Sequence, residues 1–481
     1  MFISRQLRRF PAFALLLVSG FLVSGVSLAQ ETARGGMPCV STDAPSTVEF
    51  RDAVVTALDQ EPQLAIAREE VTKARATLKA AITPFLPSVI GTFMDEKFVP
   101  TNGSAPVTVV GNEIIGGTQT YSSYGSLGLT WNLFSGGKDL AGWRGAQAGS
   151  RSSRAGLESQ LDDTLTGLFQ AYGDLFDAQR SVLEQRRTTA LLREMQARAE
   201  ERLAHGDGTT IAAEQASNKA ADAERSLFQA CHTVATKSAA LAKAAGMRLA
   251  IGFLLGVSDS LPPLEAAAVG VIPADPDSWL EHDPAVVVAK ENVTVAETKF
   301  RQAKAAYAPT ISVIGRRDFL GQNPGGLGDA NRDIGPNSYR IGIQLQQPIL
   351  PFTSETAAVS GASADVREAE SKYVQATNDA QGRVQEAWAA QREMLSAMQG
   401  ARAALESSQH ILTLTQSLYR AGRTDLDSLQ NARIDVEKAQ SQMERATSDL
   451  LVANWLFYRA VHPGEFLAAV AQRLSVELQL P

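Results

Sequence analysis

Internal self-similarity most constrains what this 481-residue chain can fold into. A shift of 222 residues places Pro62 on Pro284 and Pro87 on Pro309. Further along, a shift of 216 residues aligns a glycine and three alanines with their counterparts, placing Gly206, Ala216, Ala223 and Ala230 on Gly422, Ala432, Ala439 and Ala446. A period this long excludes a solenoid of short repeats. The chain is therefore predicted to be two copies of one unit, each with a helix, two strands, a long helix, a tip and a second long helix.

The long helical patterns contain no proline. Lys138–Ala204 and Thr356–Ala421 could each span about 100 Å, at about 1.5 Å per residue. Near the C-terminal end of the chain, large apolar residues recur every seven positions, at Leu429, Val436, Met443, Leu450 and Phe457. An alanine follows three residues after each of the first four, at Ala432, Ala439, Ala446 and Ala453. These residues form only a narrow apolar stripe, so most of the surface of each helix is polar. A helix of this kind gains most by packing between two neighbours, and we therefore expect the helices to form a closed cylinder.

A short polar break separates the two long helices of each copy. In the second copy, Gly422 can take a positive φ just past the end of one helix, and Thr424 or Asp425 can cap the next. The first copy has a matching break at His205–Thr210. Both are predicted to be tips of helical hairpins, although the heptad pattern alone would also fit a cytosolic coiled coil.

Alternating apolar and polar residues predict β-strands between the helices. One face would carry Leu127, Leu129, Trp131 and Leu133 in one strand and Tyr339, Ile341, Ile343 and Leu345 in another. The other face would carry Ser126, Gly128, Thr130 and Asn132, with Arg340, Gly342, Gln344 and Gln346. Strands of about ten residues with this alternation are typical of outer-membrane barrels. The partner strands, near 88–98 and 310–319, alternate less cleanly and are assigned by pairing.

Four strands cannot close a barrel, because the smallest outer-membrane barrels need about eight. Closure would have to come from other subunits, and the alternative is a small soluble sheet with one wet face. The polar, glycine-rich stretches 99–120 and 321–337 suit exposed loops. Aromatic residues near the strand ends are expected at the membrane interfaces, namely Phe98, Tyr121, Tyr124, Phe319 and Tyr339.

The N-terminus has the pattern of an export signal. Three arginines precede the apolar run Phe10–Val26, and Ser27-Leu28-Ala29 places small residues at the cleavage positions. Cleavage after Ala29 is predicted, with an uncleaved membrane anchor as the alternative. It would take the net charge from −7 to −10, because the segment holds three arginines and no acidic residue. This acidity argues against a nucleic-acid partner.

These patterns divide the chain into six parts. They are a signal peptide (1–29), an N-terminal tail (30–46), a first repeat (47–260), a proline-rich linker (261–276), a second repeat (277–463) and a C-terminal equatorial segment (464–481). Strands are expected near 88–98, 122–134, 310–319 and 338–350, and tips near 205–210 and 421–427. Ser46-Thr47-Val48-Glu49 fits a capping box that would open the first helix.

Cys39 and Cys231 are the only cysteines. In an oxidising periplasm they could form one disulfide, and two unpaired thiols are the open alternative. The five histidines are scattered, and no glycine-rich phosphate loop or nucleophile elbow is present. We therefore expect no enzymatic activity, no metal site and no cofactor.

The order of several motifs resembles the TolC-like outer-membrane factor family along nearly the whole mature length. The motifs are Glu61-Pro62, Pro84-Phe85-Leu86-Pro87, Trp131-Asn132-Leu133-Phe134-Ser135-Gly136-Gly137, Tyr419-Arg420-Ala421-Gly422-Arg423-Thr424 with Asp427-Ser428-Leu429, and Phe457-Tyr458-Arg459-Ala460. The resemblance implies a mostly α chain with a small β part. Three chains would build a twelve-stranded barrel in outer-membrane lipid above a long periplasmic coiled-coil α-barrel.

By the same resemblance, the homotrimer would be an outer-membrane exit duct that extends into the periplasm. It would pass drugs, metals or other toxic small molecules from an inner-membrane transporter and a periplasmic adaptor (membrane fusion) protein to the exterior. The outer-membrane component of a type I protein secretion system shares this architecture. A structural periplasmic coiled coil without a pore is the alternative from another class.

The resemblance also places adaptor docking and the periplasmic gate at the two tips. The matching docking residues are Gly206, Gly208 and Thr209 in the first tip and Gly422, Arg423, Thr424 and Asp425 in the second. Candidate gate acids are Asp207, Asp425 and Asp427, with helix capping as the competing role of Asp425. The first tip has Ile211-Ala212-Ala213 where the second has Asp427-Ser428-Leu429, so the equivalence of the two docking sites stays open.

Overall fold

The computed structural model describes most of the chain outside its two ends. The described residues are 46–99, 108–110, 113–115, 120–250, 253–257, 261, 279–323, 325–349 and 353–474. The predicted signal peptide, Cys39 and most of the predicted linker lie outside them.

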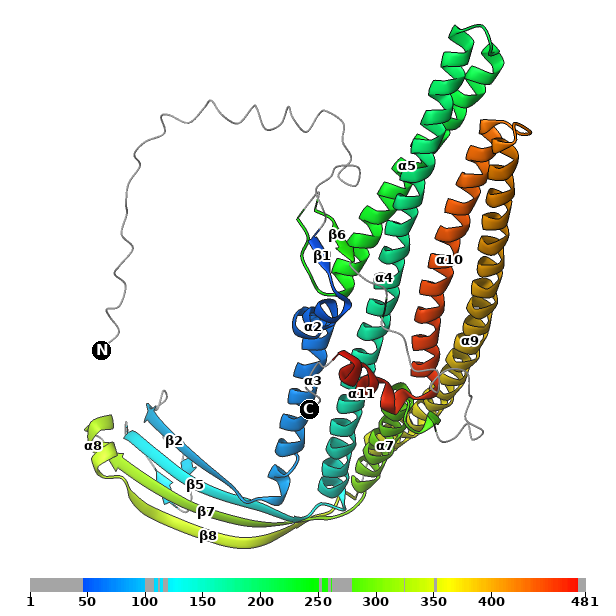
Figure 1. The fold of residues 1–481 in the computed structure, drawn as a ribbon. Helices are drawn as coiled ribbons and strands as arrows, with labels where there is room; N and C mark the ends of the chain where they lie inside the picture. Colours follow the sequence, from blue (N-terminus) through cyan, green and yellow to red (C-terminus); the bar gives the residue numbers. More distant parts are fainter. Residues whose placement is uncertain are drawn as a thin grey trace, which may run out of the picture.

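The molecule is elongated, with a β-sheet at one end and two helical hairpins that reach the other (Figure 1). The first hairpin is α4 (Lys138–Ala204) with α5 (Thr210–Ala244), and the second is α9 (Thr353–Arg420) with α10 (Leu426–Val461). Helices α4 and α9 run from the sheet to a tip without interruption, because neither contains a proline to break it. No helix in the described ranges is long and apolar enough to cross a membrane.

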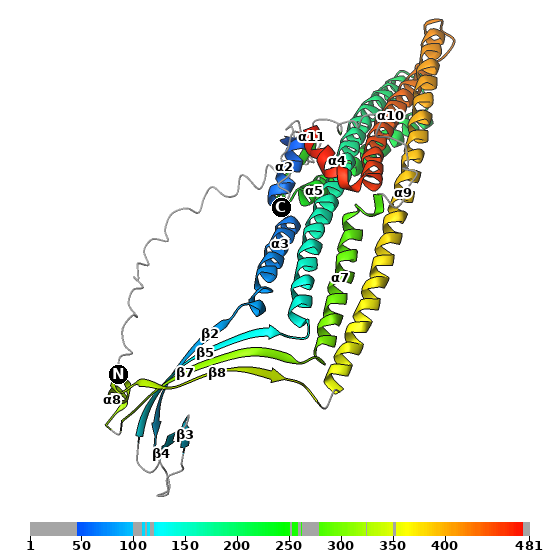
Figure 2. The same ribbon diagram turned by 90° about the horizontal axis from the view of Figure 1, so that it is seen from below.

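Two shorter helices complete the half of the molecule next to the sheet. They are α3 (Pro62–Ala80) and α7 (Pro284–Ala305), and the order of neighbours is α3, α4, α7, α9 (Figure 2). Proline suits the first position of both, because the N–H group that it lacks would have no helical partner there. Asp283 caps α7 by accepting from two backbone N–H groups of the first turn, at 3.0 and 3.2 Å.

Four antiparallel strands form the main sheet. Their order is β2 (Ser88–Phe98), β5 (Thr120–Phe134), β7 (Thr310–Asn323) and β8 (Gly335–Gln346). Each strand pairs with the next along most of its length, and no other described strand pairs with the outer edge of β2 or of β8. The sheet is therefore open at both edges.

The strand register separates an apolar face from a polar face. Val89 pairs with Leu129, which pairs with Gly315, which pairs with Ile341. The apolar face carries these residues together with Phe93, Leu127, Trp131, Val313, Tyr339, Ile343 and Leu345. On β8 its side chains are 65 to 78% exposed. The residues between them form the polar face, including Thr92, Ser126, Thr130, Arg316, Asp318, Arg340 and Gln344.

The ends of the strands differ from the sequence expectations. Tyr124 lies on the polar face, where its hydroxyl donates to Asp318 at 2.5 Å, so its assignment to an interfacial aromatic girdle was wrong. The stretches expected to be loops contain a small ladder of β3 (Thr108–Val110) and β4 (Glu113–Ile115), and a short helix α8 (Leu327–Arg332). Local composition did not reveal these elements.

A short parallel strand pair precedes the first helix. Strand β1 (Ser46–Val48) pairs with β6 (Leu255–Val257), and α2 (Phe50–Gln60) begins only afterwards. Glu49 occupies the N-cap position and makes no side-chain capping bond. The predicted capping box was therefore wrong, because a partner strand far along the chain holds Ser46 to Val48 in an extended conformation.

An aromatic core joins four helices midway along the molecule. Phe50 of α2, Phe169 of α4, Trp455 of α10 and Phe466 of α11 (Pro463–Leu474) are each at most 5% exposed. The ring centroids of Phe169 and Trp455 lie 4.9 Å apart, and those of Phe50 and Phe169 lie 4.7 Å apart. Aromatic side chains bury more apolar area than other residues, so this cluster holds the two hairpins and the C-terminal helix together.

Arg459 links α10 to α4 next to this core. Its Nε lies 2.5 Å from Asp162 Oδ2, and its Nη2 lies 2.9 Å from Asp163 Oδ1. Burial raises the pKa of Asp162 to about 6, and the charge of Arg459 opposes that rise. A second ion pair, of Arg383 with the capping residue Asp283 at 2.7 Å, links α9 to α7.

Replacing Arg459 should destabilise this junction in a pH-dependent way. Arg459→Ala leaves Asp162 buried without its cation, at a cost of about 2–4 kcal/mol when the carboxylate is charged. The loss should be smaller at pH 5, where Asp162 is protonated, than at pH 8. Thermal unfolding of the purified variant in detergent measures it. Asp163→Ala, which removes the partner that is 62% exposed, should cost less than about 0.5 kcal/mol. Equal losses for the two variants would contradict this account.

Candidate functional site at the two hairpin tips

The first tip closes with a Schellman turn. Gly206 has φ +80°, and its N–H donates to Leu203 O at 3.1 Å. The N–H of Asp207 donates to Arg202 O at 2.9 Å. These two bonds satisfy carbonyls at the end of α4 that have no helical partner. A side chain is also excluded at Gly208, where a Cβ would lie 2.8 Å from the backbone nitrogen of Leu203.

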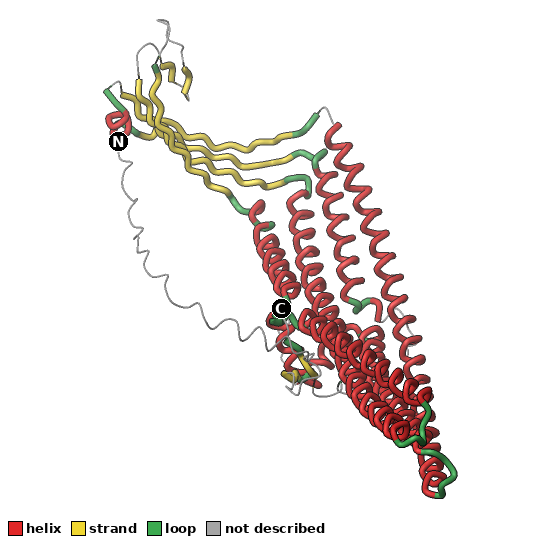
Figure 3. The backbone as a smooth tube through the Cα atoms, turned by 90° about the horizontal axis from the view of Figure 1, so that it is seen from above, coloured by secondary structure: helices red, strands yellow, loops and turns green. Residues whose placement is uncertain are grey.

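The second tip closes with the same pair of hydrogen bonds. Gly422 has φ +66°, as predicted from the sequence, and its N–H donates to Tyr419 O at 3.0 Å. The N–H of Arg423 donates to Leu418 O at 2.9 Å. Both turns lie at the end of the molecule that is distant from the sheet (Figure 3).

The residue three positions after each glycine caps the next helix. Thr209 Oγ1 accepts from the N–H of Ala212 at 3.2 Å, and Asp425 Oδ1 accepts from the N–H of Ser428 at 2.8 Å. Of the two capping candidates in the second tip, Asp425 is therefore the cap of α10, and Thr424 is not. Hydrogen bonds from Ser428, with a smaller contribution from Arg202, hold the pKa of Asp425 below its ordinary value.

A cleft of about 280 Å³ lies between the first tip and α10. Asp207, Gly208 and Thr209 line it from the first hairpin, and Asp427 and Asn431 line it from the second. Three basic residues, Arg198, Arg202 and Lys219, contribute to the same wall. The cleft thus brings acids from both tips together with cations. The sequence interpretation did not single out these cations, although all three lie within about three helical turns of the first tip.

The other predicted tip residues do not line this cleft. Gly206, Gly422, Arg423 and Thr424 lie in the turns themselves, which are exposed except that Thr424 is half-buried. Ile211 is 71% exposed at the position where the second tip has Asp427. The two tips therefore share a backbone turn and differ in surface chemistry.

Carboxylates face each other where the two hairpins pack together. Asp177 of α4 lies beside Asp449 of α10, and burial together with that neighbouring carboxylate raises the pKa of Asp177 to about 7. Burial also raises the pKa of Asp449. Ion pairs flank this pair, with Arg187 Nη1 2.8 Å from Glu437 Oε2 and Arg445 bonded to Glu184. The sequence reasoning missed this contact because its partners are distant along the chain.

The contact between Asp177 and Asp449 should make the packing of the hairpins depend on pH. The pKa of Asp177 in the folded protein lies above its ordinary value of about 3.9, so the folded state binds the proton more tightly. The stabilisation from this proton is complete below about pH 3.9 and is lost progressively as the pH rises through about 7. Thermal unfolding should show a more stable wild-type protein at pH 6 than at pH 8.

The matched variant is Asp177→Asn, which keeps a hydrogen-bonding group but cannot ionise. It should be more stable than the wild type at pH 8, by about 1–2 kcal/mol because Asp177 is partly exposed to water. The difference between the two proteins should shrink as the pH falls and vanish below about pH 4, where Asp177 is protonated in the folded and the unfolded state. Glu201→Gln, which neutralises an exposed acid on the same helix away from this pair, serves as the control. A variant that is less stable than the wild type at pH 8 would overturn the shared-proton account.

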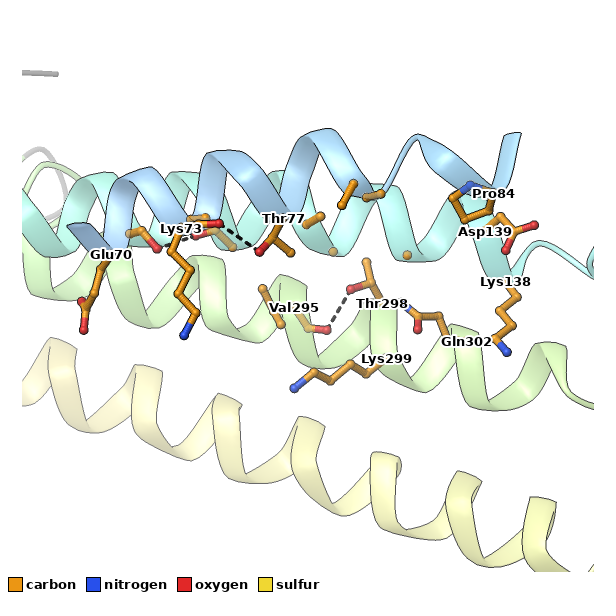
Figure 4. A pocket seen from close by; sticks show the side chains of 18 residues that line it. Glu70, Lys73, Thr77, Pro84, Lys138, Asp139, Val295, Thr298, Lys299 and Gln302 are labelled. Atoms are coloured by element: carbon orange, nitrogen blue, oxygen red, sulfur yellow. Dashed lines mark hydrogen bonds between the residues drawn. The ribbon is translucent and has the colours of Figure 1, made fainter. Parts of the chain in front are cut away.

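A larger groove of about 780 Å³ lies near the sheet, between α3, α4 and α7 (Figure 4). Its walls carry Lys73, Lys138 and Lys299 together with Glu70 and Asp139. Glycines and alanines of α4 contribute to its lining. None of the predicted tip residues lies in this groove.

The predicted cysteine pair is only partly within the described residues. Cys231 lies on α5 and is 3% exposed. Cys39 lies outside the described ranges, so its pairing with Cys231 stays a prediction. No cluster of histidine, cysteine, aspartate or glutamate suited to a metal occurs among the residues that the structure describes.

Comparisons with known proteins agree with this architecture. The model of the family described as outer membrane efflux protein matches residues 53–247 and 276–460. A curated relative, the outer membrane efflux protein BepC of Brucella suis biovar 1 (strain 1330), is 23% identical over 455 residues, which cover 93% of this chain and 89% of the relative.

Solved channel structures share the fold. The CmeC outer membrane channel of Campylobacter jejuni superposes with a TM-score of 0.70 at 17% identity, covering 90% of each chain. The outer membrane protein VceC of Vibrio cholerae superposes with a TM-score of 0.69 at 14% identity, covering 86% of this chain and 96% of that one. At these identities the likeness establishes the fold alone.

Proposed function

The chain belongs to the outer membrane efflux protein family, and from this premise we propose that three copies form the exit duct of a tripartite export system. Proteins of this family are outer-membrane channels and not enzymes, so the protein is located in the outer membrane and extends into the periplasm. The duct would pass small molecules from an inner-membrane transporter and a periplasmic adaptor protein to the exterior. The observation that carries the proposal is the four-stranded sheet, which is apolar on one face and open at both edges.

The open sheet supports closure by other copies of the chain. The free edges of β2 and β8 carry unpaired backbone groups, and within a membrane these groups need hydrogen-bonding partners. Pairing β8 of one copy with β2 of the next satisfies both edges. Three copies then give twelve antiparallel strands, which falls within the size range of outer-membrane barrels. The exposed apolar face would contact lipid, and the polar face would line the pore.

The helices support the same assembly. On α9, Val374 is 56% exposed, and Ile66 of α3 is 52% exposed. Helices α3 and α9 are the first and last members of the helical layer next to the sheet. Apolar residues exposed along both edges of a layer favour packing against a neighbouring copy. The trimer would thereby continue the layer into a closed cylinder.

The two-copy organisation is part of the proposal. Two strands followed by a helical hairpin occur twice along the chain, and both tips close with the same Schellman bonds and the same capping position. We retain the boundaries given above for the signal peptide, the tail, the two repeats, the linker and the C-terminal segment. The tips would form the periplasmic gate and the docking surface for the adaptor.

Two other functions are less well supported. The outer-membrane component of type I protein secretion would use the same duct. The relative BepC is named as an efflux protein, which favours small molecules over proteins as the cargo. A periplasmic coiled coil without a pore would have no use for a sheet whose apolar face is largely exposed.

Ion conductance in planar bilayers tests the duct and its gate. Wild-type trimers should conduct, and Asp207→Asn combined with Asp427→Asn should conduct several times more. The reason is that these two acids share the cleft with Arg198, Arg202 and Lys219, so their charges favour a closed contact between the tips. A control with Asp222→Asn and Glu214→Gln removes two acids on α5 outside the cleft and should behave as the wild type.

The outcomes separate the two claims. The absence of current from every variant, including the one with neutralised tip acids, would contradict the duct. Currents of equal size in the wild type and the double variant would contradict the assignment of the gate while leaving the duct intact.

A further inference from the structure

The polar face of the sheet carries four charged side chains among those that the structure describes. They are Glu96 on β2, Arg316 and Asp318 on β7, and Arg340 on β8. The positions of these charges in the strand register decide which of them cancel one another.

Arg316 and Asp318 neutralise each other. Arg316 Nε lies 2.7 Å from Asp318 Oδ1, and a second nitrogen of the guanidinium bonds Tyr124 Oη. Asp318 also accepts from Tyr124 Oη at 2.5 Å and from Ser338 Oγ at 3.0 Å. With three donors directed at its carboxylate, Asp318 is only 8% exposed. This network therefore contributes no net charge to the polar face.

Arg340 has no such partner. It lies directly across from Arg316 in the pairing of β7 with β8, and its side chain is exposed. Within the described ranges it makes no ion pair and no hydrogen bond through its side chain. The row of residues paired across the strands continues from Arg316 to Gly128 on β5 and Ile90 on β2, and neither carries a charge. Like charges on directly opposed residues destabilise a sheet, so structure alone does not account for this second arginine.

Glu96 is too distant to compensate Arg340. It lies six residues along β2 from Ile90, which belongs to the row of Arg340, and this separation corresponds to about 20 Å. The Debye length at physiological ionic strength is about 8 Å, so the two charges are screened from each other. Because Asp318 cancels the charge of Arg316, Arg340 leaves one uncompensated positive charge at this level in each chain.

We propose that Arg340 forms a positive ring inside the barrel and makes it selective for anions, with solutes that carry a carboxylate or phosphate group as the preferred cargo. This inference rests on the proposed trimeric duct, which would bring three copies of Arg340 to one level of the pore. Rings of arginine or lysine are a general device for anion selectivity in pores. A guanidinium group that is not occupied by a carboxylate of its own chain is free to form the paired N–H···O bonds that carboxylates and phosphates accept.

The test is the reversal potential of trimers in planar bilayers under a gradient of potassium chloride. Relative to the wild type, Arg340→Gln should shift the reversal potential toward cation preference, and Arg340→Glu should shift it further. Arg340→Lys keeps the charge and should retain the wild-type value. Comparing variants removes the contribution of the tip acids, which are the same in all of them.

Arg317→Gln is the matched control. Arg317 is exposed and lies on the apolar face, in register with Leu127 and Tyr339, so the variant loses the same charge on the other side of the sheet. It should leave the reversal potential unchanged. Inorganic phosphate, added as a probe, should reduce the chloride current of the wild type more than that of Arg340→Gln.

The possible results distinguish this inference from the proposed function. If no variant conducts, the duct itself is wrong. If Arg340→Gln conducts with the wild-type reversal potential, the positive ring is wrong and the duct stands. A shift in Arg317→Gln as large as that in Arg340→Gln would show that the polar face does not line the pore, and it would overturn the inference.

Discussion

The unpaired backbone edges of one small sheet impose the main constraint on this structure. Strands β2 and β8 each present a row of N–H and C=O groups to no partner in the described chain. In lipid such groups cost several kcal/mol each, and charged or bulged edge residues cannot relieve that cost as they do in water. The sheet can therefore be stable in the outer membrane only as part of a closed ring, and the proposed trimer meets this requirement.

The helical part is built to fit such a ring. Its helices pack closely through alanines, such as Ala432 and Ala439 on α10, which are 5 to 6% exposed. Within one chain this packing leaves α3 and α9, the outer helices of the layer next to the sheet, available to pack against neighbouring copies. The aromatic core around Trp455 and the ion pairs of Arg459 connect the hairpins midway along their length. The tips lie farthest from that core, which is where relative motion of the hairpins would cost least.

The features that could be predicted from the sequence are those with a local or periodic cause. Alternation placed Ile341 and Arg340 on opposite faces of β8, and the glycine at 422 indicated a left-handed turn, because in each case the pattern lies within a few residues. Misassignments arose where a distant partner decides the conformation. Strand β6 holds Ser46 extended. The contact of Asp177 with Asp449 was missed for the same reason. Tyr124 is a different case, because it alternates in step with Ser126 and the pattern itself would have placed it on the polar face. Docking and gating at the tips remain predictions, because a single chain does not present the surface of an assembly.

Closure of the sheet by three chains is the central claim, and native mass spectrometry of the protein purified in detergent tests it most directly. The account predicts one dominant species with three times the mass of the mature chain. A monomer, a dimer or a hexamer as the stable species would contradict it, because only three copies of four strands give the proposed barrel.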